Sequence, residues 1–256
     1  MTTSSFNFKT LSNTLFLLSA LCASFAQAAN PKRGMAFPLD LTQPGDAAKG
    51  AGTQISWEYD WNVNAPPNLP AGIEHVPMQW GRDGIDGFQG AVKGMGAKVA
   101  LGFNEPDIPE QSNIPAAEAA TLWKQGIQPL AAAGVKLGSP AVSARVAPAG
   151  TQWLKDFIAA CDGCTIDFIV VHWYGEGADN FISFVQDVHS QFPNKPIWIT
   201  EFAESRADTG LVQAFLDQAI NWLDGQDFVE RYSWFAFSVN LLDANGNVND
   251  LGKAYV

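Results

Sequence analysis

Short apolar segments alternate regularly with longer amphipathic ones along this chain of 256 residues, and this alternation constrains its fold more than any other feature. The short segments have the length and composition of β-strands. Several are almost continuously hydrophobic, such as residues 166–171 (IDFIVV), as expected for parallel strands that are covered on both faces. We expect eight strands, over residues 33–39, 54–62, 75–80, 98–104, 136–141, 167–173, 196–202 and 231–239.

Apolar residues recur at helical spacing between the later strands, and we expect helices over residues 116–133, 179–192 and 211–223. The first helix should end at Gly134, because glycine commonly caps helix C-termini. Pro66, Pro67 and Pro70 predict a loop after the second strand. Eight strands that alternate with helices predict an α/β protein with a single (β/α)8 TIM barrel. An open, doubly wound sheet is the alternative, but no G-x-G-x-x-G motif follows an early strand.

Residues 1–28 have the pattern of a secretory signal peptide. Lys9 supplies positive charge, residues 11–25 are mostly apolar, and Ala26-Gln27-Ala28 matches a cleavage site. A membrane anchor is the alternative, but a span needs about 20 apolar residues, more than this segment has. We therefore expect a secreted, extracellular protein with one domain over residues 29–256, a usual size for a single barrel.

The formal net charge of −11 narrows the possible partners. Nucleic acids and anionic membrane surfaces bind clustered cations, so we expect neither as a partner. No nucleotide fingerprint or H-E-x-x-H motif occurs, and His75, His172 and His189 are scattered along the chain. We therefore expect no cofactor and no metal ion. No helix face is left conspicuously apolar, which favours a monomer that binds a neutral ligand.

Two cysteines remain after the signal peptide, Cys161 and Cys164, in the order Cys-Asp-Gly-Cys. In an exported protein a disulfide between them is the default expectation. The alternative is a redox site, because C-x-x-C thiols can have a depressed pKa. The rest of the chain does not resemble a thioredoxin, so we expect a disulfide that closes a loop.

Two glutamates stand at the carboxyl ends of expected strands, where a (β/α)8 barrel forms its active site. Glu105 directly follows residues 98–104, and Glu201 lies near the end of residues 196–202. Glutamate is disfavoured in strands and costly to bury, so a helix-capping or ion-pairing role is the weaker alternative. A retaining glycosidase needs such a pair, one carboxylic acid to protonate the leaving oxygen and one carboxylate to attack, about 5–5.5 Å apart.

Further polar and aromatic residues near strand ends are candidates for binding a sugar. Aromatic rings can stack on the C–H faces of sugars, and polar groups can bond the hydroxyls. Asn104 is placed to bond a 2-hydroxyl, and His172 or Tyr174 to orient the nucleophile. The alternatives are core packing for the tryptophans and a structural role for His172. The candidate substrate-binding residues are Asn104, His172, Trp173, Tyr174, Trp80, Trp234, Glu58 and Gln79.

Three motifs together resemble glycoside hydrolase family 128, over nearly the whole chain from residue 33 to 255. They are residues 102–107 (GFNEPD), 171–175 (VHWYG) and 198–203 (WITEFA), followed by Trp234-Phe235 and the closing residues 241–252. Asn-Glu-Pro alone is shared by many retaining barrel enzymes, and the other two motifs make the resemblance specific. The resemblance implies a catalytic domain that cleaves β-1,3-glucan, internally by our expectation, with Glu105 as acid/base and Glu201 as nucleophile. The alternative is a barrel that binds glucan with little or no hydrolysis, but the intact glutamate pair favours an enzyme.

Overall fold

The computed structural model of the chain describes residues 1, 28–43, 45–238 and 240–256. The expected signal peptide over residues 1–28 therefore lies almost entirely outside the described residues. Within the described residues, no helix is both long and apolar enough to cross a membrane.

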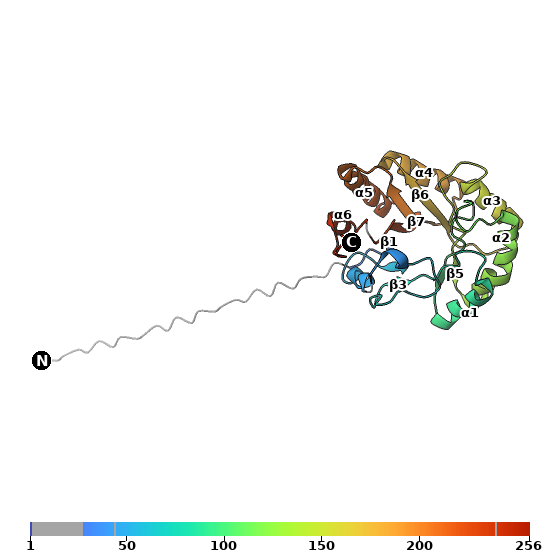
Figure 1. Ribbon diagram of the computed structural model, residues 1–256, viewed down its shortest axis with the longest axis horizontal. Coiled ribbons are helices and arrows are strands. Elements are labelled where there is room, and N and C mark those ends of the chain that lie inside the picture. The colour runs from blue at the N-terminus through green and yellow to red at the C-terminus, as the bar shows by residue number, and fades with distance from the viewer. Residues whose placement is uncertain (2–27, 44, 239) are drawn as a thin grey trace.

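Eight strands form, and each overlaps one of the eight segments expected from the sequence. All paired strands run parallel, in the order β3-β2-β1-β8-β7-β6 and, separately, β4-β5. Isolated parallel bridges join the two sheets, Met78 with Leu101 on one side and Gly138 with Phe168 on the other. Each strand thus lies beside the next in chain order and β8 beside β1, which is the arrangement of a (β/α)8 barrel (Figure 1). The strands are β1 (Arg33–Ala36), β2 (Trp57–Tyr59), β3 (Glu74–His75), β4 (Val99–Ala100), β5 (Lys136–Leu137), β6 (Ile169–Gly175), β7 (Ile197–Glu204) and β8 (Val229–Trp234).

The helices cover the outside of the later strands more completely than the outside of β2 and β3. They are α1 (Ile85–Met95), α2 (Ala116–Leu122), α3 (Gly150–Ala160), α4 (Ala178–Gln191), α5 (Thr209–Asp224) and α6 (Asp250–Tyr255). Between β1 and β2 the described residues form only 3₁₀ turns, and residues 60–73 between β2 and β3 form no helix, as the prolines there predict. Helices α1–α5 therefore surround the later strands, while loops cover the outside of β2 and β3 (Figure 1).

The expected helix over residues 116–133 is helical throughout but not uniformly α-helical. After α2 the chain forms a π-helical turn (Trp123–Ile127) and a 3₁₀ helix (Gln128–Ala133). Pro129 has no N–H to donate, so the regular i→i−4 pattern cannot continue through it. Gly134 ends the segment in a left-handed conformation with φ 78°, which confirms the predicted cap.

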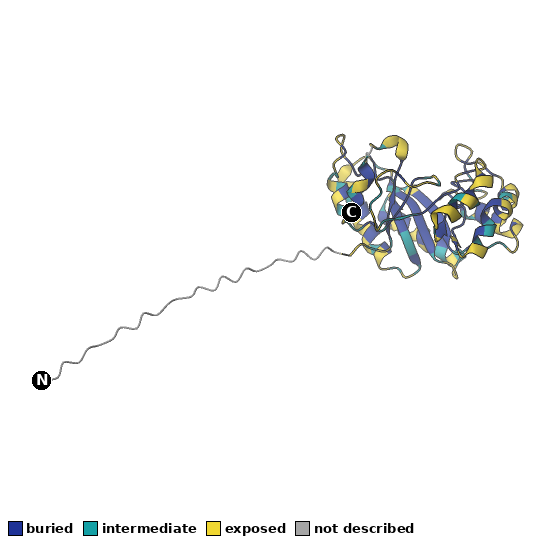
Figure 2. Ribbon diagram, turned by 90° about the horizontal axis from the view of Figure 1, so that it is seen from below, coloured by how far each residue is buried: buried dark blue, intermediate teal, exposed yellow. Residues whose placement is uncertain are grey.

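Buried side chains form two layers, because successive residues of a strand face opposite sides of the sheet. On β7, Trp198 belongs to a cluster made mainly of residues on or next to the strands, whereas Ile197 and Ile199 belong to a cluster that includes helix residues such as Phe215. The first cluster fills the barrel and the second packs helices against it. Figure 2 shows the buried residues concentrated on the strands and on the helix faces toward them.

The two cysteines form the expected disulfide. Cys161 and Cys164 are bonded, with their Cα atoms 5.4 Å apart, directly after α3. The bridge closes the turn between α3 and the segment that leads to β6.

Candidate active site

Glu105 follows β4 and faces the mouth of the barrel. Its backbone N–H donates to the carbonyl oxygen of Ala141 at 2.8 Å, and its side chain is buried. The φ angle of Glu105 is +39°, a left-handed conformation that is uncommon outside glycine. Such strain costs about 1–3 kcal/mol, and it is found where surrounding contacts hold a residue in a functional position.

Asp107 holds the loop that carries Glu105. Its carboxylate accepts hydrogen bonds from the backbone N–H and the hydroxyl of Ser143 and, at 2.9 Å, from the backbone N–H of Gly150. Ser143 lies in the loop between β5 and α3 and Gly150 is the first residue of α3, so Asp107 ties its own loop to the neighbouring connection. We did not expect this role from the sequence, although Asp107 belongs to the Asn-Glu-Pro-Asp motif that we noted.

Glu201 lies on β7 at an irregularity in the strand pairing, since the β7–β8 register shifts between Ile199 and Phe202. Two side chains donate to its Oε1, Trp61 Nε1 at 2.9 Å and the hydroxyl of Tyr59 at 3.2 Å. The hydroxyl of Tyr174 donates to its Oε2. Three neutral donors therefore orient this buried carboxylate.

His172 bridges the two glutamates from beneath. It is completely buried on β6, with Nδ1 3.0 Å from Oε1 of Glu105 and 3.4 Å from Oε2 of Glu201, and Nε2 2.9 Å from Oγ1 of Thr200. Burial alone would lower the pKa of His172, but the charge of Glu201 and the hydrogen bond to Glu105 outweigh it and raise that pKa. His172 therefore holds a proton between the two carboxylates.

The two glutamates are close enough to act on one atom. Polar atoms of Glu105, His172 and Glu201 all lie within 4.8 Å of one another. This spacing suits a retaining glycosidase and is shorter than the ~6.5–9.5 Å of an inverting pair. The three side chains also form a donor set for a metal ion, but neutral hydrogen-bond donors already occupy both oxygens of Glu201.

Tyr59 and Tyr174 remain hydrogen-bond donors at all ordinary pH values. Burial of each hydroxyl, followed by the nearby charge of Glu201, raises the pKa of both phenols well above the usual range. Neither hydroxyl therefore ionises; Tyr174 donates to Glu201, and Tyr59 shares its proton between Glu201 and the carbonyl oxygen of Thr200.

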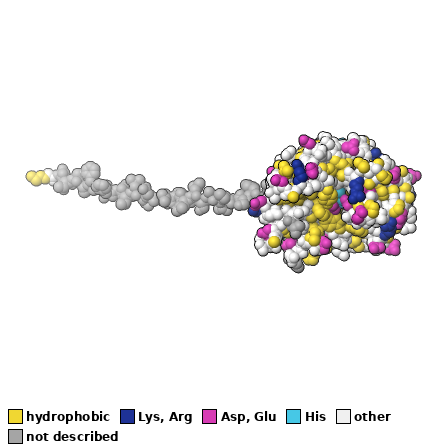
Figure 3. All heavy atoms as spheres, turned by 45° about the horizontal axis from the view of Figure 1, so that its top comes forward, with side chains coloured by type: hydrophobic (Ala, Val, Ile, Leu, Met, Phe, Trp, Pro, Cys, Tyr) yellow, Lys and Arg dark blue, Asp and Glu magenta, His cyan; other side chains and the backbone are white. Residues whose placement is uncertain are grey.

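The glutamates open onto a cavity of about 460 Å³ with an aromatic wall. Five of the residues expected from the sequence line it, namely Trp80, Asn104, Glu105, Tyr174 and Glu201. Six further residues complete the lining, namely Pro38, Asp40, Leu41, Trp61, Gln111 and Phe235. These additional residues mostly follow the carboxyl ends of strands, and that position is the signal that could have identified them. Figure 3 shows hydrophobic side chains gathered on one face of the molecule, with charged ones scattered around them.

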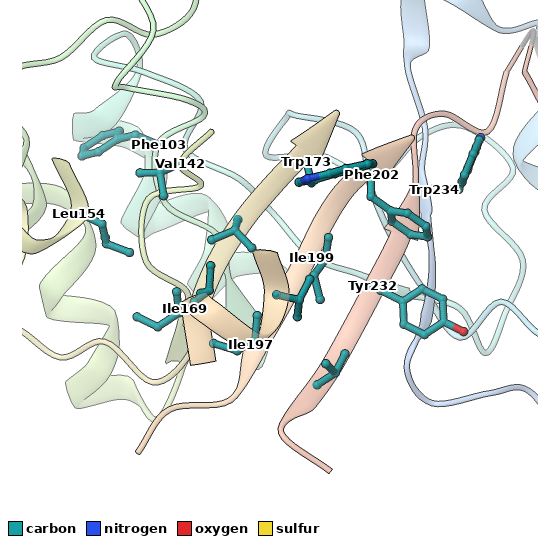
Figure 4. Close-up of a cluster of buried hydrophobic side chains, with 14 of the residues drawn as sticks. Phe103, Val142, Leu154, Ile169, Trp173, Ile197, Ile199, Phe202, Tyr232 and Trp234 are labelled. Atoms are coloured by element: carbon teal, nitrogen blue, oxygen red, sulfur yellow. The ribbon is translucent and has the colours of Figure 1, made fainter. Parts of the chain in front are cut away.

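Five of the expected substrate-binding residues do not line this cavity, and one of them is the completely buried His172. Trp173 and Trp234 lie in the outer layer, where each packs against Phe215 (Trp173 stacked at 5.5 Å) and near Phe202 (Figure 4). Trp173 faces outward because its neighbour on β6, His172, faces inward.

Gln79 and Glu58 are also directed elsewhere. Gln79 donates from Nε2 to the carbonyl oxygens of Gly81 and Asp83, so it braces the loop after β3. Glu58 lies on the outer face of β2 and bonds His75 at 2.8 Å.

The chain is similar to known proteins in both sequence and structure. A model of the glycosyl hydrolase catalytic core matches residues 34–255. Alkali-sensitive linkage protein 1 of Schizosaccharomyces pombe is 33% identical over 244 residues, which cover 88% of this chain but 44% of that protein. The chain therefore spans less than half the length of this curated relative.

Several solved structures are similar over most of their length. A curdlan-specific exo-β-1,3-glucanase of family 128, subgroup III, from Blastomyces gilchristii is 35% identical, with a TM-score of 0.79 and coverage of 88% of this chain and 99% of that one. A subgroup II endo-β-1,3-glucanase from Sorangium cellulosum is 32% identical, with a TM-score of 0.76 and coverage of 88% and 97%. A subgroup I endo-β-1,3-glucanase from Amycolatopsis mediterranei, in complex with laminaritriose, is 32% identical, with a TM-score of 0.74 and coverage of 88% and 98%.

Proposed function

The chain belongs to glycoside hydrolase family 128, and we propose that it cleaves β-1,3-glucan with net retention, using Glu105 as acid/base and Glu201 as nucleophile. Unequal hydrogen bonding of the two carboxyls carries this assignment. The carboxylate of Glu201 accepts bonds from three neutral donors, whereas among the described residues the carboxyl of Glu105 has a hydrogen bond only to His172. The donors fix Glu201 in one orientation, as an attacking carboxylate requires, and leave the carboxyl of Glu105 less constrained to reach the departing oxygen.

The first chemical step forms a covalent intermediate. A carboxylate oxygen of Glu201 attacks the anomeric carbon while the bond from that carbon to the glycosidic oxygen breaks. Glu105 gives its proton to the departing oxygen, so the leaving sugar departs as an alcohol and Glu105 becomes a carboxylate. The anomeric carbon is now joined to Glu201 by an ester bond with inverted configuration.

The second step returns both glutamates to their starting state. Glu105 takes a proton from a water molecule, whose oxygen attacks the anomeric carbon and displaces Glu201. This second inversion restores the original configuration. Tyr59, Trp61 and Tyr174 stabilise the released carboxylate and hold it in place for the next cycle.

The cavity suits a neutral sugar chain. Trp61, Trp80, Tyr174 and Phe235 provide aromatic surface, and 41% of Trp80 is exposed and available to stack on a sugar ring. Oδ1 of Asn104 is buried and accepts no hydrogen bond from the described residues, so it can accept one from a sugar hydroxyl beside the nucleophile. We expect internal cleavage, because two of the three named structural relatives are endo-β-1,3-glucanases.

We extend the proposal to the export and the oligomeric state of the protein. We expect residues 1–28 to direct export and to be removed, leaving a monomeric catalytic domain over residues 29–256. The substrate would then be an extracellular polysaccharide or its oligosaccharides.

The decisive test is release of reducing sugar from linear β-1,3-glucan by the wild type, Glu105→Gln and Glu201→Gln. We expect both variants to lose release while Glu201→Gln still binds glucan. Glu176→Gln is the matched control, because Glu176 is exposed near the same edge of the barrel and does not line the cavity. The anomeric proton signals of the first products, followed by NMR, test retention, and product lengths test internal cleavage. Wild-type protein that binds glucan without releasing sugar would contradict the enzyme and leave a glucan-binding barrel.

A further inference from the structure

A second group of buried ionisable residues lies outside the barrel, on the face of β2 and β3 that loops rather than helices cover. Glu58 lies on the outer face of β2, opposite the inward-facing Trp57 and Tyr59, and Asp60 directly follows the strand. His75 is the registered partner of Glu58 across the β2–β3 ladder. Two carboxyls and an imidazole therefore meet on the rigid frame of the sheet.

These side chains are buried more deeply than their charge would normally allow. Glu58 is 0% exposed and Asp60 is 2% exposed. Buried charges are stable only when they are paired, and among the described residues His75 is the ion-pair partner that Glu58 has. One imidazolium would balance only one of the two carboxylates.

Two buried carboxylate oxygens of this group have no hydrogen-bond donor among the described residues. Nε2 of His75 lies 3.0 Å from the carbonyl oxygen of Val63, and since a carbonyl can only accept, Nε2 carries a proton. Nδ1 then faces Oε2 of Glu58 at 2.8 Å. Oε1 of Glu58 and Oδ2 of Asp60 are both buried and bond nothing in the described residues. Two carboxylate oxygens without donors thus lie beside the imidazole, whose Nδ1 can bind a cation once its own proton is displaced.

We propose that Glu58, Asp60 and His75 form a binding site for one divalent transition-metal ion, for which zinc is the best match. Their potential ligand atoms lie within 4.8 Å of one another, and the ligand atoms of a tetrahedral zinc ion lie roughly 3.3–3.6 Å apart, so the side chains need to close by about an ångström. Two carboxylates neutralise a divalent ion, and an imidazole ligand favours zinc over calcium or magnesium. A ligating histidine commonly donates its other N–H to a carbonyl, as His75 does to Val63.

The bound ion would brace the part of the barrel that lacks a covering helix. It would join β2, β3 and the loop of residues 60–73, and β2 leads directly into Trp61, which bonds Glu201. Its role is structural, because the ligands do not line the catalytic cavity. The site is independent of the proposed glucanase activity, and its test needs no substrate.

Zinc binding is measured by equilibrium dialysis and elemental analysis of chelator-treated protein. The Glu201→Gln variant serves as the background, because Glu105, His172 and Glu201 form a second possible donor set. About pH 8 is suitable, since burial raises the pKa of Glu58 to about 7 and a proton competes with the metal. We expect one zinc ion per chain and a Tm that rises when zinc is added.

Substitutions of the ligands identify the site. Adding Asp60→Asn or Glu58→Gln to the background should weaken zinc binding about tenfold or more and abolish the rise in Tm. Adding Glu74→Gln should change neither, because the carboxylate of that neighbouring residue pairs with Arg231 instead. Circular dichroism checks that each variant folds.

X-ray absorption of the zinc-loaded background variant is a second measurement that needs no ligand substitution. We expect oxygen and nitrogen ligands with a single imidazole. Substoichiometric zinc, equal binding by the Asp60→Asn variant, or a spectrum with sulfur or several imidazoles would each overturn the proposal.

Discussion

Replacing Asp107 by asparagine tests whether this residue holds the catalytic loop. Asparagine keeps the shape of the side chain but has one acceptor oxygen and no charge. In the protein, Oδ2 of Asp107 accepts bonds from the hydroxyl of Ser143 and the backbone N–H of Gly150. The amide group of the variant cannot accept either bond if it takes that place.

The expected cost follows from these contacts. A hydrogen bond to a charged group is worth about 1.5–3 kcal/mol, and two are lost. The hydroxyl of Ser143 can rotate and accept from the new amide, which returns part of this energy, whereas the N–H of Gly150 has no such choice. We expect a loss of about 2–4 kcal/mol in the free energy of unfolding, which corresponds to a fall in Tm of roughly 5–15 °C for a domain of this size.

Activity should fall as well, because Glu105 is two residues from Asp107 and has a strained φ of +39°. A small displacement of the acid/base affects the reaction more than binding, so we expect kcat to fall about tenfold or more while KM changes less than about twofold. Thermal unfolding and steady-state kinetics on β-1,3-glucan measure both effects, and Ser143→Ala, which removes only the hydroxyl, should give a smaller change. An Asp107→Asn protein with the Tm and kcat of the wild type would refute this reasoning.

Three further predictions concern two aromatic residues of the cavity, one tryptophan of the outer layer and an ion pair at the end of β7. Trp80→Ala should raise KM about tenfold without lowering Tm, because the exposed ring stacks on sugar. Trp173→Ala should instead lower the free energy of unfolding by about 3–5 kcal/mol and leave the KM of the folded protein unchanged. Equal effects of the two substitutions would contradict the placement of these tryptophans. Tyr174→Phe should lower kcat/KM about 10–100-fold by removing a donor to the nucleophile, and an unchanged value would show that this bond is dispensable. Arg206 lowers the pKa of Glu204 from 4.5 to about 2, so the pair stabilises the fold above about pH 4.5 and loses its effect as the pH falls toward 2. The Tm difference between Arg206→Ala and the wild type should therefore be present at pH 7 and shrink across that range.

The strands were predictable because burial on both faces imposes apolar runs. All eight were expected near their observed positions, and the prolines after β2 correctly indicated a loop. The helices α1 and α3 were not expected. α1 contains Gly87, Gly90 and Gly94, which weaken helix propensity, and only Ile85, Phe88 and Val92 mark its buried face. The chain forms this helix because packing against the barrel outweighs the propensity of its residues.

The meeting of Glu105 and Glu201 at the mouth of the barrel was predictable because strand ends and carboxylates can be read directly from the sequence. For other residues on the strands, it was harder to predict which face of the sheet the side chain lies on. Trp173, Trp234 and Glu58 are near strand ends, yet each faces outward, and the pairing register of β6 and β7 shifts between Val171 and His172. Loop residues were hardest of all, since Trp61 reaches Glu201 through a backbone with φ of +58° that no periodicity specifies.

The donors around Glu201 also explain why it can be both stable and reactive. Burial of a carboxylate is costly, and an arginine or lysine would offset that cost most strongly. Such a pair would also hold the anion tightly and oppose its attack on the anomeric carbon. Among the described residues no lysine or arginine forms an ion pair with Glu201, and neutral hydroxyl and indole groups serve instead. His172 is shared between the two carboxylates, since its Nδ1 lies 3.0 Å from Glu105 and 3.4 Å from Glu201, so the proton on this nitrogen can be donated to either one.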